Sequence, residues 1–147
     1  ADAIKSRTKS IDIALVKLAE PLPQTFVSAP IAWTDRLMVD QSVTIGGYGL
    51  SIENEPKTSG IFHSATLKVI EPYGPSKILI WLKGRDNNMG SCTGDSGGPI
   101  MNDQGQLIGI ISWAEGTGRL QCGSLTQGIL LGPQKKFIQR ILEQWNT

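Results

Sequence analysis

Short apolar runs, separated by Gly, Pro and Asn, recur along the chain from residue 11 to residue 131. Runs this short and this rich in Ile, Val, Leu and Trp are typical of strands, so the pattern predicts an all-β fold. The expected strands are Ile11–Leu18, Ser42–Gly47, Ile61–Ile70, Lys77–Lys83, Pro99–Asn102, Leu107–Trp113 and Gln127–Leu131. The segment from Asn102 to Gly105 has the composition of a hairpin turn, and Gly105 is expected to adopt a positive φ.

A helical period replaces the strand pattern near the C-terminus. Pro133 suits the first position of a helix, and apolar side chains then recur on one helical face. They are Phe137, Ile138, Ile141, Leu142 and Trp145. The sequence therefore predicts a helix of about three turns whose apolar stripe packs on the body of the fold.

Composition and charge exclude several classes of partner. A chain of 147 residues with 39% apolar residues is sufficient for one enclosed core. Fourteen Lys and Arg residues against thirteen Asp and Glu residues give a net charge of +1, without a run of like charge, so no nucleic-acid partner is expected. No apolar run approaches the length of a membrane span, so no membrane partner is expected either.

The chain has two cysteines, Cys92 and Cys122. They could be two free thiols in the core or the two halves of a disulfide. Both lie in polar, Gly-rich segments where a free thiol would be exposed. That placement favours a disulfide and an oxidising compartment.

The segment Gly94-Asp95-Ser96-Gly97-Gly98-Pro99 carries the strongest chemical signal. A serine hydroxyl becomes a good nucleophile only when a base takes its proton and hydrogen-bond donors receive the oxyanion that forms. Flanking glycines allow the backbone to turn two N–H groups toward one point. An ordinary Gly-rich turn would explain the glycines equally well, so the segment alone leaves both interpretations open.

In full, this segment is similar to the active-serine motif of the chymotrypsin/trypsin-like serine proteases, and the resemblance extends along almost the whole chain. The segment from Asp12 to Leu18 resembles the strand that carries the family's triad aspartate. The segment from Gly46 to Gly49 resembles the Gly-aromatic-Gly element that opens the second barrel, and Ile110 to Trp113 resembles the segment that pairs with the substrate backbone.

The resemblance implies a chymotrypsin-like double β-barrel, of which this chain holds the complete second barrel. Residues 1–20 would form the last strand of the first barrel, and residues 21–41, with prolines at positions 21 and 23, the linker between barrels. Residues 42–131 would form the second barrel with the active serine, and residues 132–147 the C-terminal α-helix.

The same resemblance assigns roles to particular residues of a serine endopeptidase. Ser96 would be the nucleophile that forms an acyl-enzyme, and Asp12 the buried carboxylate that orients a catalytic histidine. The N–H groups of Gly94 and Ser96 would form the oxyanion hole. Cys92 and Cys122 would form the disulfide, and Ser112 would donate a hydrogen bond to Asp12.

Substrate binding is expected at six positions: Gly90, Ser91, Ser112, Trp113, Ala114 and Gly128. In the family, the residue six positions before the active serine forms the floor of the specificity pocket, and here it is Gly90. A basic side chain entering a neutral pocket would lose its hydration without gaining a partner. We therefore expect cleavage after neutral, medium-sized apolar residues in protein or peptide substrates, with no cofactor and no metal.

The catalytic histidine is expected on another piece of protein. In the family's chain order it precedes the aspartate, yet no histidine precedes Asp12, and the single histidine, His63, is expected to be a partly exposed strand residue. The simplest account is a secreted two-chain enzyme, extracellular or periplasmic, whose N-terminal chain comes from the same zymogen and carries the histidine. A protein fragment or a pseudoprotease remains an alternative. Asp95 would pair with the α-amino group that activation cleavage releases.

Overall fold

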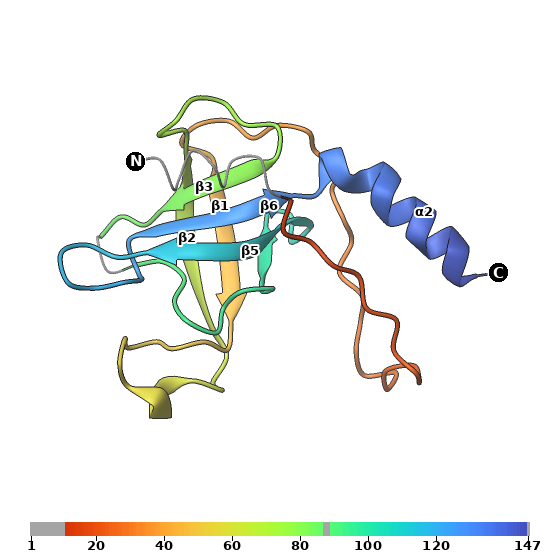
Figure 1. Ribbon diagram of the computed structural model, residues 1–147, viewed down its shortest axis with the longest axis horizontal. Coiled ribbons are helices and arrows are strands. Elements are labelled where there is room, and N and C mark those ends of the chain that lie inside the picture. The colour runs from red at the N-terminus through yellow and green to blue at the C-terminus, as the bar shows by residue number, and fades with distance from the viewer. Residues whose placement is uncertain (1–10, 87–88, 147) are drawn as a thin grey trace.

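Six antiparallel strands form a closed barrel (Figure 1). The computed structural model describes residues 11–86 and 89–146. Around the barrel the strands follow the order β1-β2-β3-β6-β5-β4, and every neighbouring pair is antiparallel. Their bounds are β1 Ser42–Gly47, β2 His63–Ile70, β3 Leu79–Lys83, β4 Pro99–Met101, β5 Leu107–Glu115 and β6 Leu125–Leu130.

Alternating side chains of these strands fill the barrel interior. Leu82 and Ile100 are fully buried there, and they belong to a cluster drawn from all six strands. Burying one such side chain contributes about 1.5–3 kcal/mol. On the outer face, Leu79, Trp81 and Ile129 form a second cluster. Six of the seven expected strands therefore form the core, as predicted, with ends that differ from the expected ones by a few residues.

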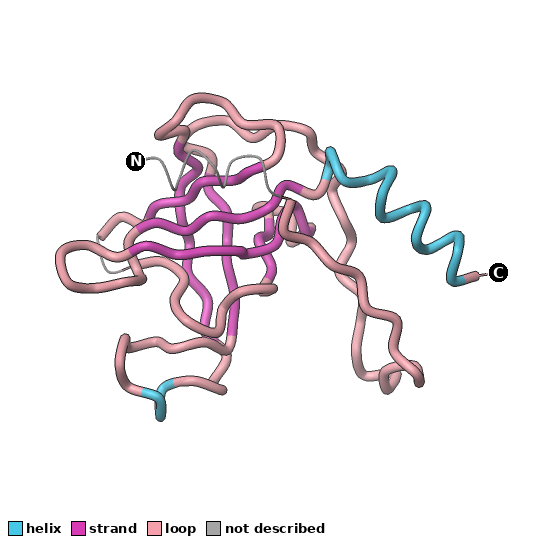
Figure 2. Tube along the Cα trace, in the orientation of Figure 1, coloured by secondary structure: helices cyan, strands magenta, loops and turns pink. Residues whose placement is uncertain are grey.

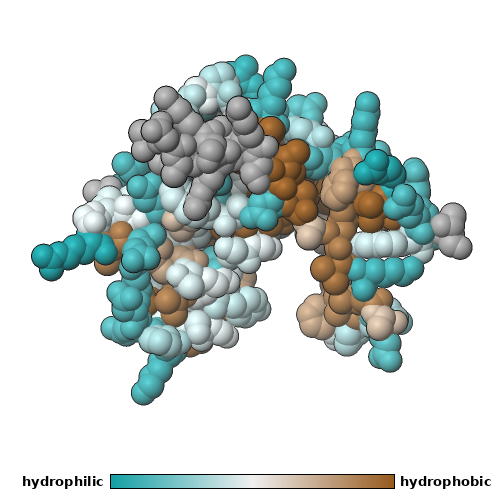
Figure 3. All heavy atoms as spheres, viewed as in Figure 1, coloured by the Kyte–Doolittle hydropathy of each residue, from teal (hydrophilic) through white to brown (hydrophobic). Residues whose placement is uncertain are grey.

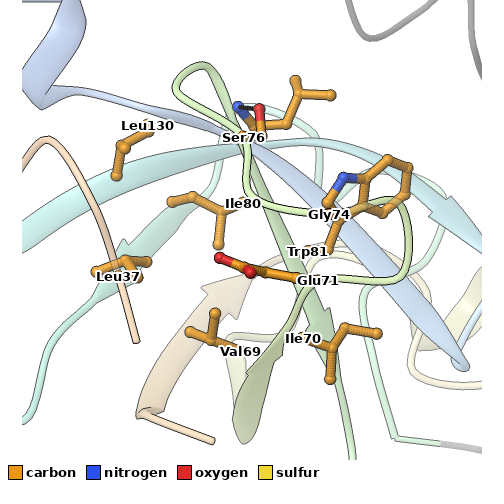
Figure 4. A pocket seen from close by; sticks show the side chains of 10 residues that line it. Leu37, Val69, Ile70, Glu71, Gly74, Ser76, Ile80, Trp81 and Leu130 are labelled. Carbon is orange, nitrogen blue, oxygen red and sulfur yellow. Dashed lines mark hydrogen bonds between the residues drawn. The ribbon is translucent and has the colours of Figure 1, made fainter. Parts of the chain in front are cut away.

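A small pocket of about 20 Å³ lies at the edge of this core. Its walls include the side chains of Leu37, Val69, Ile80 and Leu130, with Glu71 among them (Figure 4). The space suffices for about one water molecule. None of its lining residues belongs to the active-serine motif, so we assign it no chemical role.

The predicted hairpin is present between β4 and β5. Gly105 has a φ of 71°, which confirms the expected positive value. The Asn102 side-chain oxygen accepts hydrogen bonds from the N–H groups of Gln104 and Gln106, at 3.0 and 2.9 Å. An asparagine that bonds the backbone of its own turn is a common way of fixing such a connection.

The C-terminal helix is also present, but it projects away from the barrel (Figure 1). It begins as a 3₁₀ turn, η2 (Gly132–Gln134), and continues as α2 (Lys135–Trp145). Another 3₁₀ turn, η1 (Pro56–Thr58), lies between β1 and β2. The apolar stripe of α2 packs less than predicted, since Ile138 is its buried residue while Leu142 is 45% exposed. A helical stripe is buried only where another surface covers it, and the described residues cover only this end.

The expected strand Ile11–Leu18 is not a strand in this structure. Residues 11–29, which we call the arm, run beside α2 without helix or strand (Figure 2). The reason is that a strand needs the backbone of a neighbouring strand, and the described residues offer none to the arm. Val16 is accordingly 78% exposed, and apolar side chains of the arm border the hollow between arm and barrel (Figure 3). Lys17 Nζ bonds the carbonyl oxygen of Trp145 at 2.8 Å and ties the arm to the helix.

Candidate active site

Ser96 lies in an exposed loop immediately before β4. It stands between Gly94, with a φ of 94°, and Gly97, with a φ of 85°. These left-handed conformations are readily available to glycine alone, which explains the glycines of the motif. The Gly97 N–H donates to the carbonyl of Ile111 at 2.8 Å, so the loop is fixed to β5.

The N–H groups of Gly94 and Ser96 donate to no other group among the described residues. The N–H between them, that of Asp95, is occupied, since it donates to the Cys92 carbonyl at 3.1 Å. Two free backbone donors beside a serine hydroxyl suit the charge that develops on a carbonyl oxygen under attack.

Ser112 connects the nucleophile with the expected triad aspartate. Its carbonyl accepts a hydrogen bond from Ser96 Oγ at 3.3 Å, and its hydroxyl donates to Asp12 Oδ2 at 2.6 Å. The structure thus brings together Asp12, Ser112 and Ser96, as the sequence predicted for the pair of Asp12 and Ser112. Asp12 was expected to be buried, but it is exposed, because no other part of the described chain covers the arm.

Asp95 is 3% exposed, and its carboxylate has three partners. Oδ1 accepts from the Gly49 N–H at 2.8 Å, and Oδ2 accepts from the Cys92 N–H at 2.9 Å. The third partner is His63, whose Nε2 lies 3.3 Å from Oδ1. His63 is partly exposed and lies in a strand, as predicted, although the strand begins at His63 itself and not at Ile61. Sequence reasoning missed its contact with Asp95, 32 positions away.

A disulfide joins Cys92 to Cys122 and closes 30 positions of chain. Beside it, the Glu53 carboxylate accepts hydrogen bonds from the N–H groups of Gln121 and Cys122, at 2.8 and 3.2 Å. Glu53 therefore fixes the long loop that follows β5 onto the loop after β1. Glu53 was not predictable as a functional residue, because an acid in a polar loop carries no local sign of a partner 68 positions away.

Three of the expected specificity residues, Gly90, Ser91 and Ala114, lie around Thr126 of β6, a residue that sequence reasoning missed. The Thr126 hydroxyl accepts the Ser91 N–H at 2.8 Å and lies 2.9 Å from Ser91 Oγ. A Cβ added to Gly90 would lie 3.2 Å from that hydroxyl oxygen. Thr126 also pairs with Ala114, beside Trp113 on β5, so both sides of the expected pocket meet at this residue.

Gly128 does not lie at this place. A Cβ added to it would collide with Cδ1 of Ile100, so Gly128 faces the barrel core. The expected wall position was displaced by two residues along β6, and Thr126 occupies it. The correction matters because Thr126 adds a side chain where a glycine was expected to leave space.

The described ranges contain no cluster of three His, Cys, Asp or Glu residues that could hold a metal ion. Within the same ranges, no helix is both long and apolar enough to cross a membrane.

Comparison with known proteins identifies the relatives of this chain. The family model described as Trypsin matches residues 2–128. Human kallikrein-11 is 29% identical over 113 residues, covering 71% of this chain and 40% of the relative. Scolexin B of Heliothis virescens is 30% identical over 123 residues, covering 76% of this chain and 42% of the relative. Snake venom serine protease rhinocerase 4 of Bitis rhinoceros is 33% identical over 113 residues, covering 70% and 44%. The chain thus spans less than half the length of these relatives.

Two solved structures share the fold. Mouse neuropsin, described as a serine protease, superposes with a TM-score of 0.67 and 22% identity, covering 83% of this chain and 56% of the other. A mutant of human heparin binding protein superposes with a TM-score of 0.70 and 17% identity, covering 84% and 53%. Both contain the chymotrypsin fold, of which this barrel and its C-terminal helix are a part. On the family match over most of its length, the chain belongs to the trypsin family of serine proteases.

Proposed function

We propose that this chain is the part of a secreted serine endopeptidase that carries the nucleophile and the oxyanion hole. The observation that supports this proposal most directly is that the N–H groups of Gly94 and Ser96 are free beside the exposed Ser96 hydroxyl. Such donors stabilise the charge of the transition state more than that of the substrate, which is the condition for catalysis. The disulfide supports a secreted, oxidising location.

In the proposed reaction, Ser96 Oγ attacks the scissile carbonyl and its proton passes to a histidine on the N-terminal part of the protein. The carbonyl oxygen becomes an oxyanion held by the Gly94 and Ser96 N–H groups. As the peptide bond breaks, the histidine gives its proton to the leaving amine and an ester remains on Ser96. Water activated by the same histidine then hydrolyses the ester and restores the hydroxyl. Asp12 would orient the histidine, and Ser112 would hold Asp12.

The N-terminal part would form the first barrel and lie on the arm. Two features support this: the exposed apolar side chains of the arm, and the length of the chain, less than half that of its curated relatives. Strand pairing of Ile11–Leu18 would follow from that docking, since a neighbouring strand is what the segment lacks. We place this N-terminal part on a separate chain derived from the same precursor.

We propose that the enzyme cleaves after neutral apolar residues. Gly90, Ser91 and Thr126 bring no charge to the expected pocket, so Lys, Arg and Glu side chains would enter it without a partner. Thr126 and Ala114 together narrow the pocket, which favours small to medium side chains such as Ala, Val, Leu and Met.

A non-catalytic binding protein is the second candidate. The one histidine of this chain, His63, contacts Asp95, so the base must come from elsewhere. Human heparin binding protein, whose name states a binding activity, has the same fold. Fold alone does not decide between hydrolysis and binding.

Labelling with a fluorophosphonate, which reacts only with an activated serine, decides between the two candidates. The assembled full-length protein should be labelled at Ser96, and the variant Ser96→Ala should not. A protein that folds, carries the first barrel and remains unlabelled would be the binding protein. Profiling the labelled enzyme with a peptide library then tests specificity, and a dominant preference for Lys, Arg or Glu would refute the neutral pocket.

A further inference from the structure

His63 is the only histidine in the sequence, and the proposed reaction leaves it without a role. Its side chain is 33% exposed. Nε2 lies 3.3 Å from Asp95 Oδ1 and 3.5 Å from Oδ2, while Nδ1 lies 3.2 Å from the carbonyl oxygen of Ile61. Both ring nitrogens therefore face oxygen atoms that accept hydrogen bonds.

These contacts fit the protonated ring. A neutral imidazole has one N–H, so it would donate to one of the two oxygens and turn a lone pair toward the other. The imidazolium donates at both nitrogens, and toward Asp95 it also supplies a charge opposite to that of the carboxylate.

His63 lines two neighbouring spaces. One is an open cavity of about 490 Å³, and the other is a smaller space of about 20 Å³ that Asp95 also lines. His63 thus stands between the open cavity and Asp95. Besides Asp95, the titratable group lining these two spaces is Glu53, whose carboxylate is bound to the Gln121 and Cys122 N–H groups.

The orientation of Asp95 determines the geometry of the oxyanion hole. Asp95 lies between the two residues whose N–H groups would form it, so a rotation of its backbone turns both donors. Hydrogen bonds from the Gly49 and Cys92 N–H groups fix the direction of its carboxylate, but they bring no full positive charge. A buried carboxylate without a countercharge is unfavourable, and among the described residues His63 is its ionic partner.

We propose that His63 is a positioning residue, whose imidazolium pairs with Asp95 and holds the Gly94 and Ser96 N–H groups in the arrangement that receives the oxyanion. His63 thereby takes the role that the sequence analysis expected of a chain-terminal α-amino group. The protein would then hold an assembled oxyanion hole before any activation cleavage. The consequence for peptide hydrolysis rests on the proposed function, whereas the pairing itself does not.

The first experiment uses the full-length protein with a few residues added at the native N-terminus, so that no α-amino group reaches Asp95. We compare His63→Gln, His63→Lys and the wild type by fluorophosphonate labelling and by kcat/KM on a neutral peptide ester. His63→Gln should lose about tenfold in kcat/KM, a moderate effect because His63 is partly exposed. His63→Lys restores a cation and should recover to within about threefold of the wild type. Lys68→Ala is the matched control, since it removes an exposed cation of β2 that bonds Ser42 instead of Asp95.

Rescue by lysine separates a charge from a merely structural contact. A role of the charge predicts that His63→Lys recovers kcat/KM while the neutral His63→Gln does not. A structural role of the imidazole ring alone would leave His63→Lys as impaired as His63→Gln.

The second experiment does not depend on activity. In a Ser96→Ala background, a double-mutant cycle of His63→Gln and Asp95→Asn measures their coupling in the free energy of unfolding. Amide hydrogen exchange at Asp95 and Gly97, whose N–H groups donate to the Cys92 and Ile111 carbonyls, should accelerate about tenfold in His63→Gln and remain unchanged in Lys68→Ala. The proposal is wrong if the effects of the two mutations on the free energy of unfolding are additive and amide exchange in the loop is unchanged.

The outcomes distinguish the two proposals. If no form is labelled but the cycle shows coupling, the endopeptidase is refuted and the role of His63 in holding the loop is supported. The opposite result would be that the wild type is labelled only when its N-terminal α-amino group is free, and that His63→Gln is labelled under the same condition. In that case the amine is the partner of Asp95, and the His63 proposal is wrong.

Discussion

Ser112 Oγ donates a hydrogen bond to Asp12 Oδ2 at 2.6 Å, although 100 positions separate the two residues in the sequence. The carbonyl oxygen of the same Ser112 accepts the hydroxyl of Ser96. One residue of β5 thus contacts both expected triad members of this chain. The arm is therefore held at the nucleophile by a specific polar contact, even though its apolar side chains are exposed.

The Ser112 contact predicts graded losses of activity. In the full-length enzyme, Asp12→Asn should lower kcat by about ten-thousandfold, the loss known for the same change in the triad template. Ser112→Ala should cost about tenfold, because it removes one charge-assisted hydrogen bond at an exposed carboxylate and keeps the carboxylate itself. Steady-state kinetics measure both. Equal losses in the two variants would show that Ser112 does more than hold Asp12.

Gly49 predicts a steric effect on the active-serine loop. A Cβ at this position would lie 2.6 Å from the backbone nitrogen of Asp95 and from the carbonyl oxygen of Thr93. Gly49→Ala should therefore displace the loop and lower kcat/KM by about 100-fold, the size expected for a displacement near 1 Å. Tyr48→Phe is the control, because Tyr48 is exposed and its ring would be retained. Unchanged kinetics in Gly49→Ala would show that the loop has room to adapt.

Glu53 predicts a local change in mobility. Glu53→Ala removes the acceptor of the Gln121 and Cys122 N–H groups, so both amides should exchange faster with solvent. Since the same loop borders the expected pocket, KM should rise more than kcat falls. Amide hydrogen exchange measures the first effect and steady-state kinetics the second. Glu55→Ala provides an exposed control on the same loop. Protection that survives in Glu53→Ala would contradict the expected role.

Thr126 predicts a loss of stability without a change of charge preference. Thr126→Val keeps the shape but removes the acceptor of the buried Ser91 N–H, which should cost about 1–3 kcal/mol in the free energy of unfolding. Chemical denaturation of the assembled protein measures this cost. The exposed Thr66→Val on β2 is the control and should change stability by less than about 0.5 kcal/mol. The preference for neutral substrates should persist in both variants.

The barrel was predictable because its strands pair with one another inside this chain. Apolar runs such as Ser42–Gly47 have their partners among the described residues, so local pattern and observed structure agree. The active-serine motif was predictable because glycines with positive φ are a local requirement, as at Gly94 and Gly97.

Other features were not predictable for an equally physical reason. Ile11–Leu18 has the composition of a strand, but composition does not supply the neighbouring backbone that a strand needs. His63, Glu53 and Thr126 each act on residues more than 30 positions away. Such contacts are produced by strand register, and a displacement of two residues along β6 was enough to exchange Gly128 for Thr126.

The way the barrel closes determines which part of it unfolds first. Between β1 and β4 the ladder pairs Thr44 with Met101 and Ile45 with Ile100, which makes it a shorter seam than that between β1 and β2. β4 begins three residues after Ser96, so the nucleophile lies next to the strand with the fewest paired residues. Partial opening at this seam would release the serine before the rest of the barrel loosens. Mild heating should thus abolish fluorophosphonate labelling of Ser96 at a temperature below the melting temperature of the whole fold.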